Sequence, residues 1–173
     1  ASAADTRLDT RINVDPGRDH RRIAVEDLDG DGSNEVLIIS TSPSGSGDSL
    51  HVYNADGSLR FTHIPGRPVT WGSRIYKGFN ANSVHFLRDP DGSLGLWVTA
   101  SHVSWFPSLL QRLSPRGELL SEYWSNGVIR AIRPAILKGR SYLLVGAYNN
   151  ETHGASLAFL DMARASGTAP AEK

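Results

Sequence analysis

The stretch Asp27-Leu28-Asp29-Gly30-Asp31-Gly32-Ser33-Asn34-Glu35 runs directly into Val36-Leu37-Ile38-Ile39. Three aspartates alternate with other residues, and a glutamate stands at the ninth position. The alternation places the aspartates on one side of a tightly curved loop, and the two glycines permit the curvature. Because four carboxylates this close together repel one another, the pattern predicts a hard divalent cation with several oxygen ligands, such as Ca²⁺.

The residues after the loop decide which kind of calcium site to expect. An EF-hand begins in the same way but needs a bidentate glutamate at its twelfth position and a helix after it. The twelfth position here is Ile38, inside an apolar run typical of a strand. The last acidic ligand must therefore be Glu35, so the pattern predicts a strand–loop–strand site. An acidic solvated turn that binds no ion, or a site for another divalent ion, are the alternatives.

The composition indicates a mostly β chain. Among 173 residues, Lys plus Arg and Asp plus Glu number 18 each, so no net field favours nucleic acid or an acidic membrane surface. The 17 glycines and 9 prolines, with few helix-periodic stretches, predict many turns and short strands. No run approaches the ~18 apolar residues of a membrane span. The length suits one domain with a sizeable core.

Compartment is indicated by two features. The start Ala1-Ser2-Ala3 resembles the small-residue end of a cleaved secretory signal. Calcium loops of this kind commonly work at millimolar calcium, which is found outside the cytosol. We therefore expect an extracytoplasmic protein, whether secreted, periplasmic or on the cell surface.

A repeating unit of four strands runs along the chain. Residues 20–63 predict four antiparallel strands, the last two joined by the hairpin signal Asn54-Ala55-Asp56-Gly57. A thirteen-residue leucine spacing marks each unit, at Leu37/Leu50, Leu96/Leu109 and Leu144/Leu157. The predicted organisation is an N-terminal segment 1–19 with a possible closing strand at Arg7 to Val14, a first unit 20–63, a link 64–79, a second unit 80–125, a third unit 126–162 and a flexible tail 163–173.

These units resemble blades of the FG-GAP/VCBS repeat family of β-propellers, which includes the calcium-loop blades of integrin α subunits. The match runs from Ile23 to Thr62: an apolar strand, the Asp-x-Asp-x-Asp-Gly-x-x-Glu loop, a second apolar strand and the Asn-x-Asp-Gly hairpin. The resemblance implies an all-β, propeller-type fold of antiparallel four-stranded blades. It also implies one structural Ca²⁺, held by Asp27, Asp29, Asp31, the carbonyl of Ser33 and Glu35.

The chain also departs from the family. The Phe-Gly and Gly-Ala-Pro signatures are absent from the sequence. The second unit keeps only Asp89 and Asp91, a weak second cation site, and the third has Lys138-Gly139-Arg140, which cannot hold a cation. Three blades are fewer than the four to eight of typical propellers. We expect part of a longer propeller, a propeller completed by other chains, or a compact non-radial stack.

Catalytic motifs are weak. Gly47-Asp48-Ser49-Leu50 spells the nucleophile block of the GDSL esterases, but no Asp-x-x-His pair follows late in the chain. Ser49 instead occupies the same place in its unit as Ser108 and Ser156. The six histidines have no zinc-binding spacing. We expect a protein that is not an enzyme.

A binding face is predicted from the topology. In a four-stranded blade, the first and third turns share one end with the calcium loop, and the second turn lies at the other. Aromatic side chains beside Arg and Asn are enriched at protein contacts, although packing between blades would also use aromatic residues. The residues expected at the far end are Trp71, Arg74, Tyr76, His102, Trp105, Phe106, Tyr148, Asn149 and His153.

Together these patterns predict a non-enzymatic, calcium-stabilised module for protein–protein interaction or surface assembly. A lectin-like, polysaccharide-binding module is one alternative, which the aromatic loops would also suit. An accessory part of a larger hydrolase or lyase is another.

Overall fold

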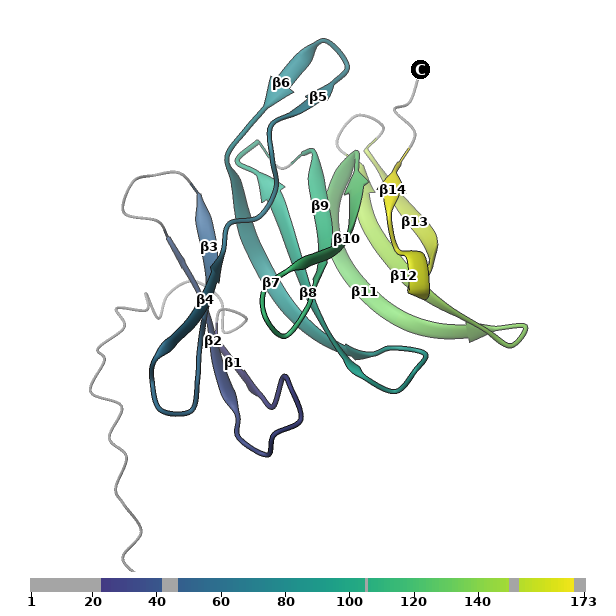
Figure 1. The fold of residues 1–173 in the computed structure, drawn as a ribbon. Helices are drawn as coiled ribbons and strands as arrows, with labels where there is room; N and C mark the ends of the chain where they lie inside the picture. Colours follow the sequence, from purple (N-terminus) through teal and green to yellow (C-terminus); the bar gives the residue numbers. More distant parts are fainter. Residues whose placement is uncertain (1–22, 42–46, 105, 150–152, 170–173) are drawn as a thin grey trace, which may run out of the picture.

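The structure is a computed structural model that describes residues 23–41, 47–104, 106–149 and 153–169. These residues form strands and one short 3₁₀ helix, with no α-helix among them. All strand pairs are antiparallel except one (Figure 1). The prediction of an all-β chain built from antiparallel sheets is confirmed.

The first sheet contains the acidic loop and has the strand order β1-β2-β3-β4. Its strands are β1 (Ile23–Glu26), β2 (Glu35–Thr41), β3 (Asp48–Tyr53) and β4 (Leu59–His63). The acidic loop joins β1 to β2, and the turn between β3 and β4 is closed by the Gly57 N–H, which donates to the Asn54 carbonyl at 2.9 Å. The predicted four-stranded unit therefore forms a single sheet.

The second and third sheets follow along the chain. The second sheet has the order β14-β10-β9-β8-β7, and the third has the order β11-β12-β13. The strands of the second sheet are β7 (Phe79–Arg88), β8 (Leu94–His102), β9 (Ser108–Leu113), β10 (Leu119–Ser125) and β14 (Gly167–Thr168). Those of the third are β11 (Gly127–Leu137), β12 (Arg140–Asn149) and β13 (Gly154–Asp161).

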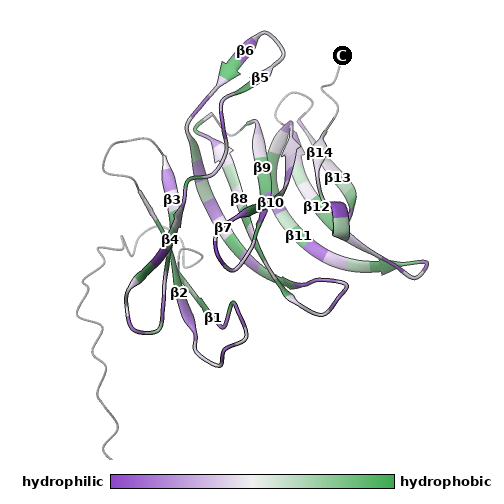
Figure 2. Ribbon diagram, viewed as in Figure 1, coloured by the Kyte–Doolittle hydropathy of each residue, from purple (hydrophilic) through white to green (hydrophobic). Residues whose placement is uncertain are grey.

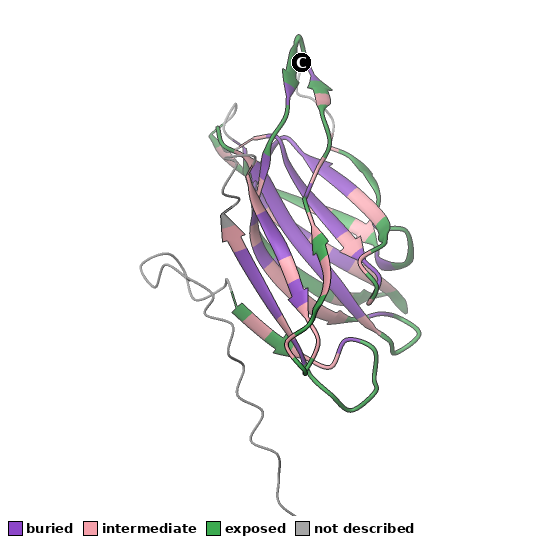
Figure 3. Ribbon diagram, turned by 60° about the vertical axis from the view of Figure 1, so that its left-hand side comes forward, coloured by how far each residue is buried: buried purple, intermediate pink, exposed green. Residues whose placement is uncertain are grey.

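The second sheet is the middle layer of the molecule. Leu96 and Val98 of β8 pack in one cluster with Leu37 of the first sheet. Trp97, between them on β8, packs in another cluster with Ile132 of the third sheet. Because both faces of β8 are covered, its residues from Gly95 to Ser101 are buried one after another rather than alternately, with Thr99 and Ser101 included (Figures 2 and 3).

Turns gather at the two ends of the sheets as the topology predicts. The β1–β2 loop and the turns β3–β4, β7–β8 and β11–β12 lie at the lower end in Figure 1, and the β8–β9 connection lies at the upper end. The hairpin of β5 (Val69–Trp71) and β6 (Arg74–Tyr76) also extends from the upper end, within the predicted link. Among the described residues, the sheets do not close into a ring or a barrel.

The end of the chain corrects one prediction. The sequence predicted a flexible tail from residue 163, but residues 163–168 include the end of a 3₁₀ helix, one buried alanine and a short strand. The 3₁₀ helix η1 (Met162–Arg164) is followed by Ala165, which is 1% exposed. Strand β14 then pairs in parallel with β10, and the Ala169 N–H donates to the Trp124 carbonyl at 2.8 Å. The possible closing strand Arg7 to Val14 lies outside the described residues. In the described part of the chain, no helix has the length and apolar character needed to span a membrane.

Candidate metal centre

The acidic loop is wrapped around the Asp27 carboxylate. Its Oδ1 accepts hydrogen bonds from the backbone N–H groups of Gly30 at 2.8 Å and Asp31 at 3.2 Å, and its Oδ2 accepts from Gly32 at 3.0 Å. Gly30 and Gly32 adopt φ angles of 76° and 88°, a left-handed conformation that glycine reaches without a steric penalty. The two glycines therefore let the chain turn back on the first aspartate, as their spacing predicted.

Three carboxylates converge at this loop. One oxygen each from Asp27, Asp29 and Glu35 lie within 4.8 Å of one another. Glu35 is only 2% exposed, and its Oε2 accepts a hydrogen bond from the Leu28 N–H at 2.9 Å, which holds the side chain under the loop. Carboxylate oxygens are hard donors that suit hard divalent cations. The cluster could therefore bind a metal ion.

The other two predicted ligands lie differently. Asp31 is exposed and uses its Oδ1 to accept a hydrogen bond from the Ser33 N–H at 2.7 Å, so it shapes the loop from outside the three-carboxylate cluster. Ser33 is also exposed. The structure thus brings together three of the five residues that the family resemblance implies as ligands.

Arg60 is a cationic member of the cluster that the sequence interpretation missed. Its Nη2 lies 2.6 Å from Asp29 Oδ2, and its Nη1 lies 3.0 Å from Glu35 Oε1. The hydrogen bond from Arg60 holds the pKa of Asp29 below its ordinary value. A signal existed in the sequence: Arg60 stands just after the third turn of its unit, and that turn shares an end with the acidic loop.

The second acidic turn does not repeat this arrangement. Asp89 is buried, and its Oδ2 lies 2.5 Å from Arg112 Nη2, while Asp91 Oδ1 accepts from the Ser93 N–H at 2.9 Å. Burial raises the pKa of Asp89, and the neighbouring Arg112 opposes that shift. Outside the Asp27–Asp29–Glu35 cluster, the described residues contain no other group of three His or acidic side chains placed to share a metal.

A wide cleft opens beside the metal centre. It has a volume of about 950 Å³ and runs between the loops of the first and second sheets. Asp27, Asp29 and Arg60 line one side, and Arg112 and Arg116 line another. Ions can therefore reach the Asp27 and Asp29 carboxylates from solvent, whereas Glu35 does not line the cleft.

The residues of the predicted binding face fall into two groups. Near the β5–β6 hairpin, the Tyr76 ring lies 5.1 Å from the His102 ring and 5.7 Å from the Phe106 ring. Trp71 and Tyr76 are 8% and 9% exposed and pack in one cluster with Phe79 and Trp124, so these two aromatics fill the space against the second sheet.

The remaining members are spread more widely. Arg74 is exposed on β6. At the β12–β13 end, Tyr148 is 40% exposed, His153 is exposed and Asn149 is 2% exposed. Trp105 lies outside the described residues.

The sequence of the GDSL-like block has a structural counterpart that is not a catalytic triad. Ser49 Oγ lies 3.1 Å from His51 Nε2, and the other ring nitrogen of His51 lies 3.1 Å from the hydroxyl of Thr62. A serine–histidine pair of hydrolases places a carboxylate at that second nitrogen. Here a neutral hydroxyl takes its place, and the Ser49 side chain is buried in the sheet.

Comparison with known proteins does not assign this chain to a family. No family model, no curated protein and no solved structure matches the chain. The functional argument therefore rests on the geometry described above.

Proposed function

We propose that this chain is a non-enzymatic, extracytoplasmic, calcium-stabilised module of the propeller type, and that it binds protein through the exposed face of an end sheet. Its first partner is a further copy of itself. The proposal rests on three features: the grouping of the first strands, the apolar faces left at the ends of the stack, and the acidic cluster.

The first strands of the three sheets support a radial arrangement. A groove of about 380 Å³ is lined by Ile23 of β1, Val84 of β7 and Arg130 of β11. In a propeller, the first strand of every blade lies next to the central axis. The grouping of β1, β7 and β11 around one groove is the arrangement that three neighbouring blades would have.

The apolar outer face of the third sheet carries the proposal. In this sheet, Leu143, Val145 and Ala147 point to the core. The alternate positions of β12 and β13 face the other way and include Phe159, which is 53% exposed, and Leu157, which is 57% exposed. Exposed apolar residues that gather on one face mark an interaction surface.

The unpaired edge of the same sheet also supports the proposal that this sheet binds another chain. Strand β14 covers the edge of β10 in the second sheet, whereas no described strand pairs with the outer edge of β13. Unpaired N–H and C=O groups at a sheet edge are a template for another chain. The first sheet, at the other end of the stack, likewise turns Val25 and Leu59 outward, at 54% and 55% exposed. The two ends can therefore meet in a head-to-tail assembly.

Light scattering across a concentration series tests the assembly. We expect a mass above that of one chain that falls to the single-chain mass at high dilution, and Phe159→Lys should give the single-chain mass throughout. Ile75→Lys is the matched control, because Ile75 is 73% exposed on the β5–β6 hairpin, away from this face. A wild-type chain that is monomeric at every concentration would contradict self-assembly.

Calcium has a structural role in this proposal. Asp27, Asp29 and Glu35 hold the ion and join β1, the loop and β2, so the ion stabilises the fold without taking part in a reaction. The acidic cluster supports the extracytoplasmic location that we propose, since such loops fill at the millimolar calcium found outside the cytosol.

Thermal unfolding with Ca²⁺ and with a chelator tests the site. We expect the melting temperature to rise with Ca²⁺ in the wild type and to lose that rise in Asp29→Ala. Asp56→Ala is the control, because Asp56 caps a turn through Ser58 and lies outside the cluster. A melting temperature that does not change on chelation would show that the loop is an acidic turn that binds no Ca²⁺.

A further inference from the structure

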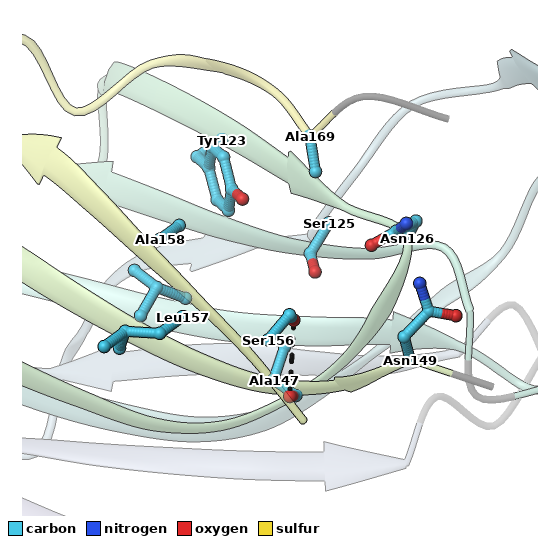
Figure 4. Close-up of a pocket in the computed structure, with 10 residues that line it drawn as sticks. Tyr123, Ser125, Asn126, Ala147, Asn149, Ser156, Leu157, Ala158 and Ala169 are labelled. Carbon is cyan, nitrogen blue, oxygen red and sulfur yellow. Dashed lines mark hydrogen bonds between the residues drawn. The ribbon is translucent and has the colours of Figure 1, made fainter. Parts of the chain in front are cut away.

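A further cavity lies between the second and third sheets, on the far side of the second sheet from the acidic loop. Its volume is about 180 Å³, several times the ~30 Å³ that one water molecule occupies in the liquid. Strand β10 forms one wall, β12 and β13 form another, and Ala169 closes the rim after β14 (Figure 4). The parallel pairing of β14 with β10 therefore shapes this pocket.

The polar groups in the pocket are all neutral. They are the hydroxyls of Tyr123, Ser125 and Ser156 and the carboxamides of Asn126 and Asn149. In Figure 4 the Ser156 hydroxyl donates to the Ala147 carbonyl at 3.3 Å, and the Tyr123 and Ser125 hydroxyls point toward the space between the two sheets. No Asp, Glu, Lys, Arg or His lines the pocket. A charged ligand would lose its hydration there without gaining a partner of opposite charge.

Apolar groups complete the lining. Val145, Ala147 and Ala158 present methyl groups beside the hydroxyls and carboxamides. A wall that combines aliphatic carbon with neutral donors and acceptors matches a ligand whose surface has both C–H and O–H groups.

Tyr123 is the residue that points most directly to a ligand. It is only 6% exposed, and no hydrogen bond joins its hydroxyl to another described residue, although the oxygen is not among the fully buried polar atoms and so borders the open space of the pocket. Tyr hydroxyls that are buried usually find such a partner. Burial also raises the pKa of Tyr123, so the group is a neutral phenol that can both donate and accept. The pocket is where a partner for this hydroxyl can enter.

We propose that this pocket binds a neutral sugar residue, one ring of a monosaccharide or the end of a glycan. The Tyr123 hydroxyl and the Ser and Asn side chains bind the ring hydroxyls, and the methyl groups of Val145, Ala147 and Ala158 contact the C–H face. This site is separate from the aromatic loops at the upper end, where Trp71 and Tyr76 are used for packing. It is independent of the metal centre, and Leu157 lines both this pocket and the assembly face.

Chemical-shift titration with methyl glycosides tests the proposal. The probes are methyl glycosides of glucose, galactose, mannose, fucose and N-acetylglucosamine, each added up to about 50 mM, a concentration at which weak binding of a few-atom ligand is detectable. We expect saturable shifts with at least one probe, and none with glucuronate or glucosamine at the same concentration.

Matched variants locate the binding. Tyr123→Phe removes one hydroxyl and should weaken binding about fivefold, the effect of one neutral hydrogen bond. Tyr53→Phe makes the same chemical change in the first sheet and should leave the affinity unchanged. Ala169→Leu fills the rim and should abolish binding while the melting temperature confirms the fold. Absence of saturable shifts with every neutral probe, equal binding of glucuronate, or unchanged affinity in Tyr123→Phe would overturn the proposal.

Discussion

Arg60, on β4, donates a hydrogen bond to Asp29 at 2.6 Å across a sequence separation of 31 residues. The same guanidinium reaches Glu35, at the start of β2. The outermost strand on one side of the first sheet is thereby connected to the loop that joins the two strands on the other side. Arg60 acts as a built-in cation among carboxylates that a metal ion would otherwise have to neutralise.

Replacing Arg60 should distinguish the contribution of its guanidinium from the contribution of Ca²⁺ at the metal centre. In Arg60→Gln the carboxylates lose their only positive partner within the described residues, so the melting temperature in chelator should fall below that of the wild type. The Ca²⁺ affinity should rise, by about fivefold, because the ion no longer competes with a guanidinium. Calorimetric titration with Ca²⁺ measures the affinity.

Arg116→Gln is the control for this pair of measurements. Arg116 is exposed and lines the same cleft but makes no ion pair with the cluster. If Arg60→Gln and Arg116→Gln change the affinity equally, Arg60 has no special relationship with the metal centre. If neither variant nor the wild type binds Ca²⁺, the calcium site itself is wrong.

Gly95 is predicted to be irreplaceable. A Cβ at this position would lie 2.8 Å from Asp89 Oδ2 and 2.8 Å from Trp97 Nε1, both on buried side chains. Gly95→Ala should destabilise the protein by about 2 kcal/mol, since overpacked cores lose stability. Urea unfolding measures the change. Gly146→Ala should be tolerated, because its nearest contact would be 3.8 Å away, and equal losses in the two variants would contradict the prediction.

The Asp89–Arg112 pair should be costly to break at neutral pH. The Asp89 side chain is 3% exposed, so Arg112→Met leaves a buried carboxylate without its guanidinium, at a cost of about 3–5 kcal/mol. Because burial raises the pKa of Asp89 in the folded state, protonation of the carboxyl is favoured by folding. The loss in Arg112→Met should therefore grow as the pH rises above 3.8 through the folded pKa.

Urea unfolding at several pH values, with the double variant Asp89→Asn/Arg112→Met, checks this prediction. The neutral asparagine needs no guanidinium, so the double variant should recover part of the lost stability at pH 7. A double variant no more stable than Arg112→Met would indicate that the arginine acts through packing against Trp97, whose ring centroid lies 5.9 Å away.

His63 should make stability depend on pH. It is hydrogen-bonded to Gln111 Oε1 at 2.8 Å between the first and second sheets, and burial holds its pKa below the ordinary 6.5. The unfolded chain therefore takes up the proton first as the pH falls. Stability should be full above pH 6.5 and decline below it, by at most about 1.4 kcal/mol per pH unit.

The test of His63 is the slope of unfolding free energy between pH 7.5 and 5.5, compared with His63→Gln. The glutamine keeps a donor for Gln111 but has no proton to gain in this range, so its slope should be smaller. His102→Gln serves as the control, since it changes a half-buried histidine at the other end of the second sheet. Equal slopes for wild type and His63→Gln would contradict the assignment.

The first sheet was predictable because its signals are local. Strand β2 follows directly from the apolar run after Glu35, and β3 and β4 flank a turn whose Asn54 and Gly57 are separated by two residues. The β5–β6 hairpin was missed although Gly72-Ser73 is a two-residue turn signal, because three-residue strands are too short to show a period.

What the sequence could not predict depends on contacts between distant segments. Strand β14 has two residues, Gly167 and Thr168, and its partner Tyr123 lies on β10, so neither periodicity nor spacing announces the pair. The same applies to the metal centre. The carboxylates are visible in one short stretch, whereas Arg60 reaches them only after β3 and β4 have folded back.

The return of the chain to β10 has a mechanical consequence. The chain leaves the second sheet after Ser125, builds the whole third sheet and comes back to the second sheet at Gly167. The third sheet is therefore an insertion whose two ends are both held at β10: its first end follows β10 in the chain, and its last end leads to β14, which pairs with β10. A force applied to the chain after Thr168 acts on the β14–β10 pair before it acts on β13. The third sheet should therefore stay folded until the hydrogen bonds of that short parallel pair break.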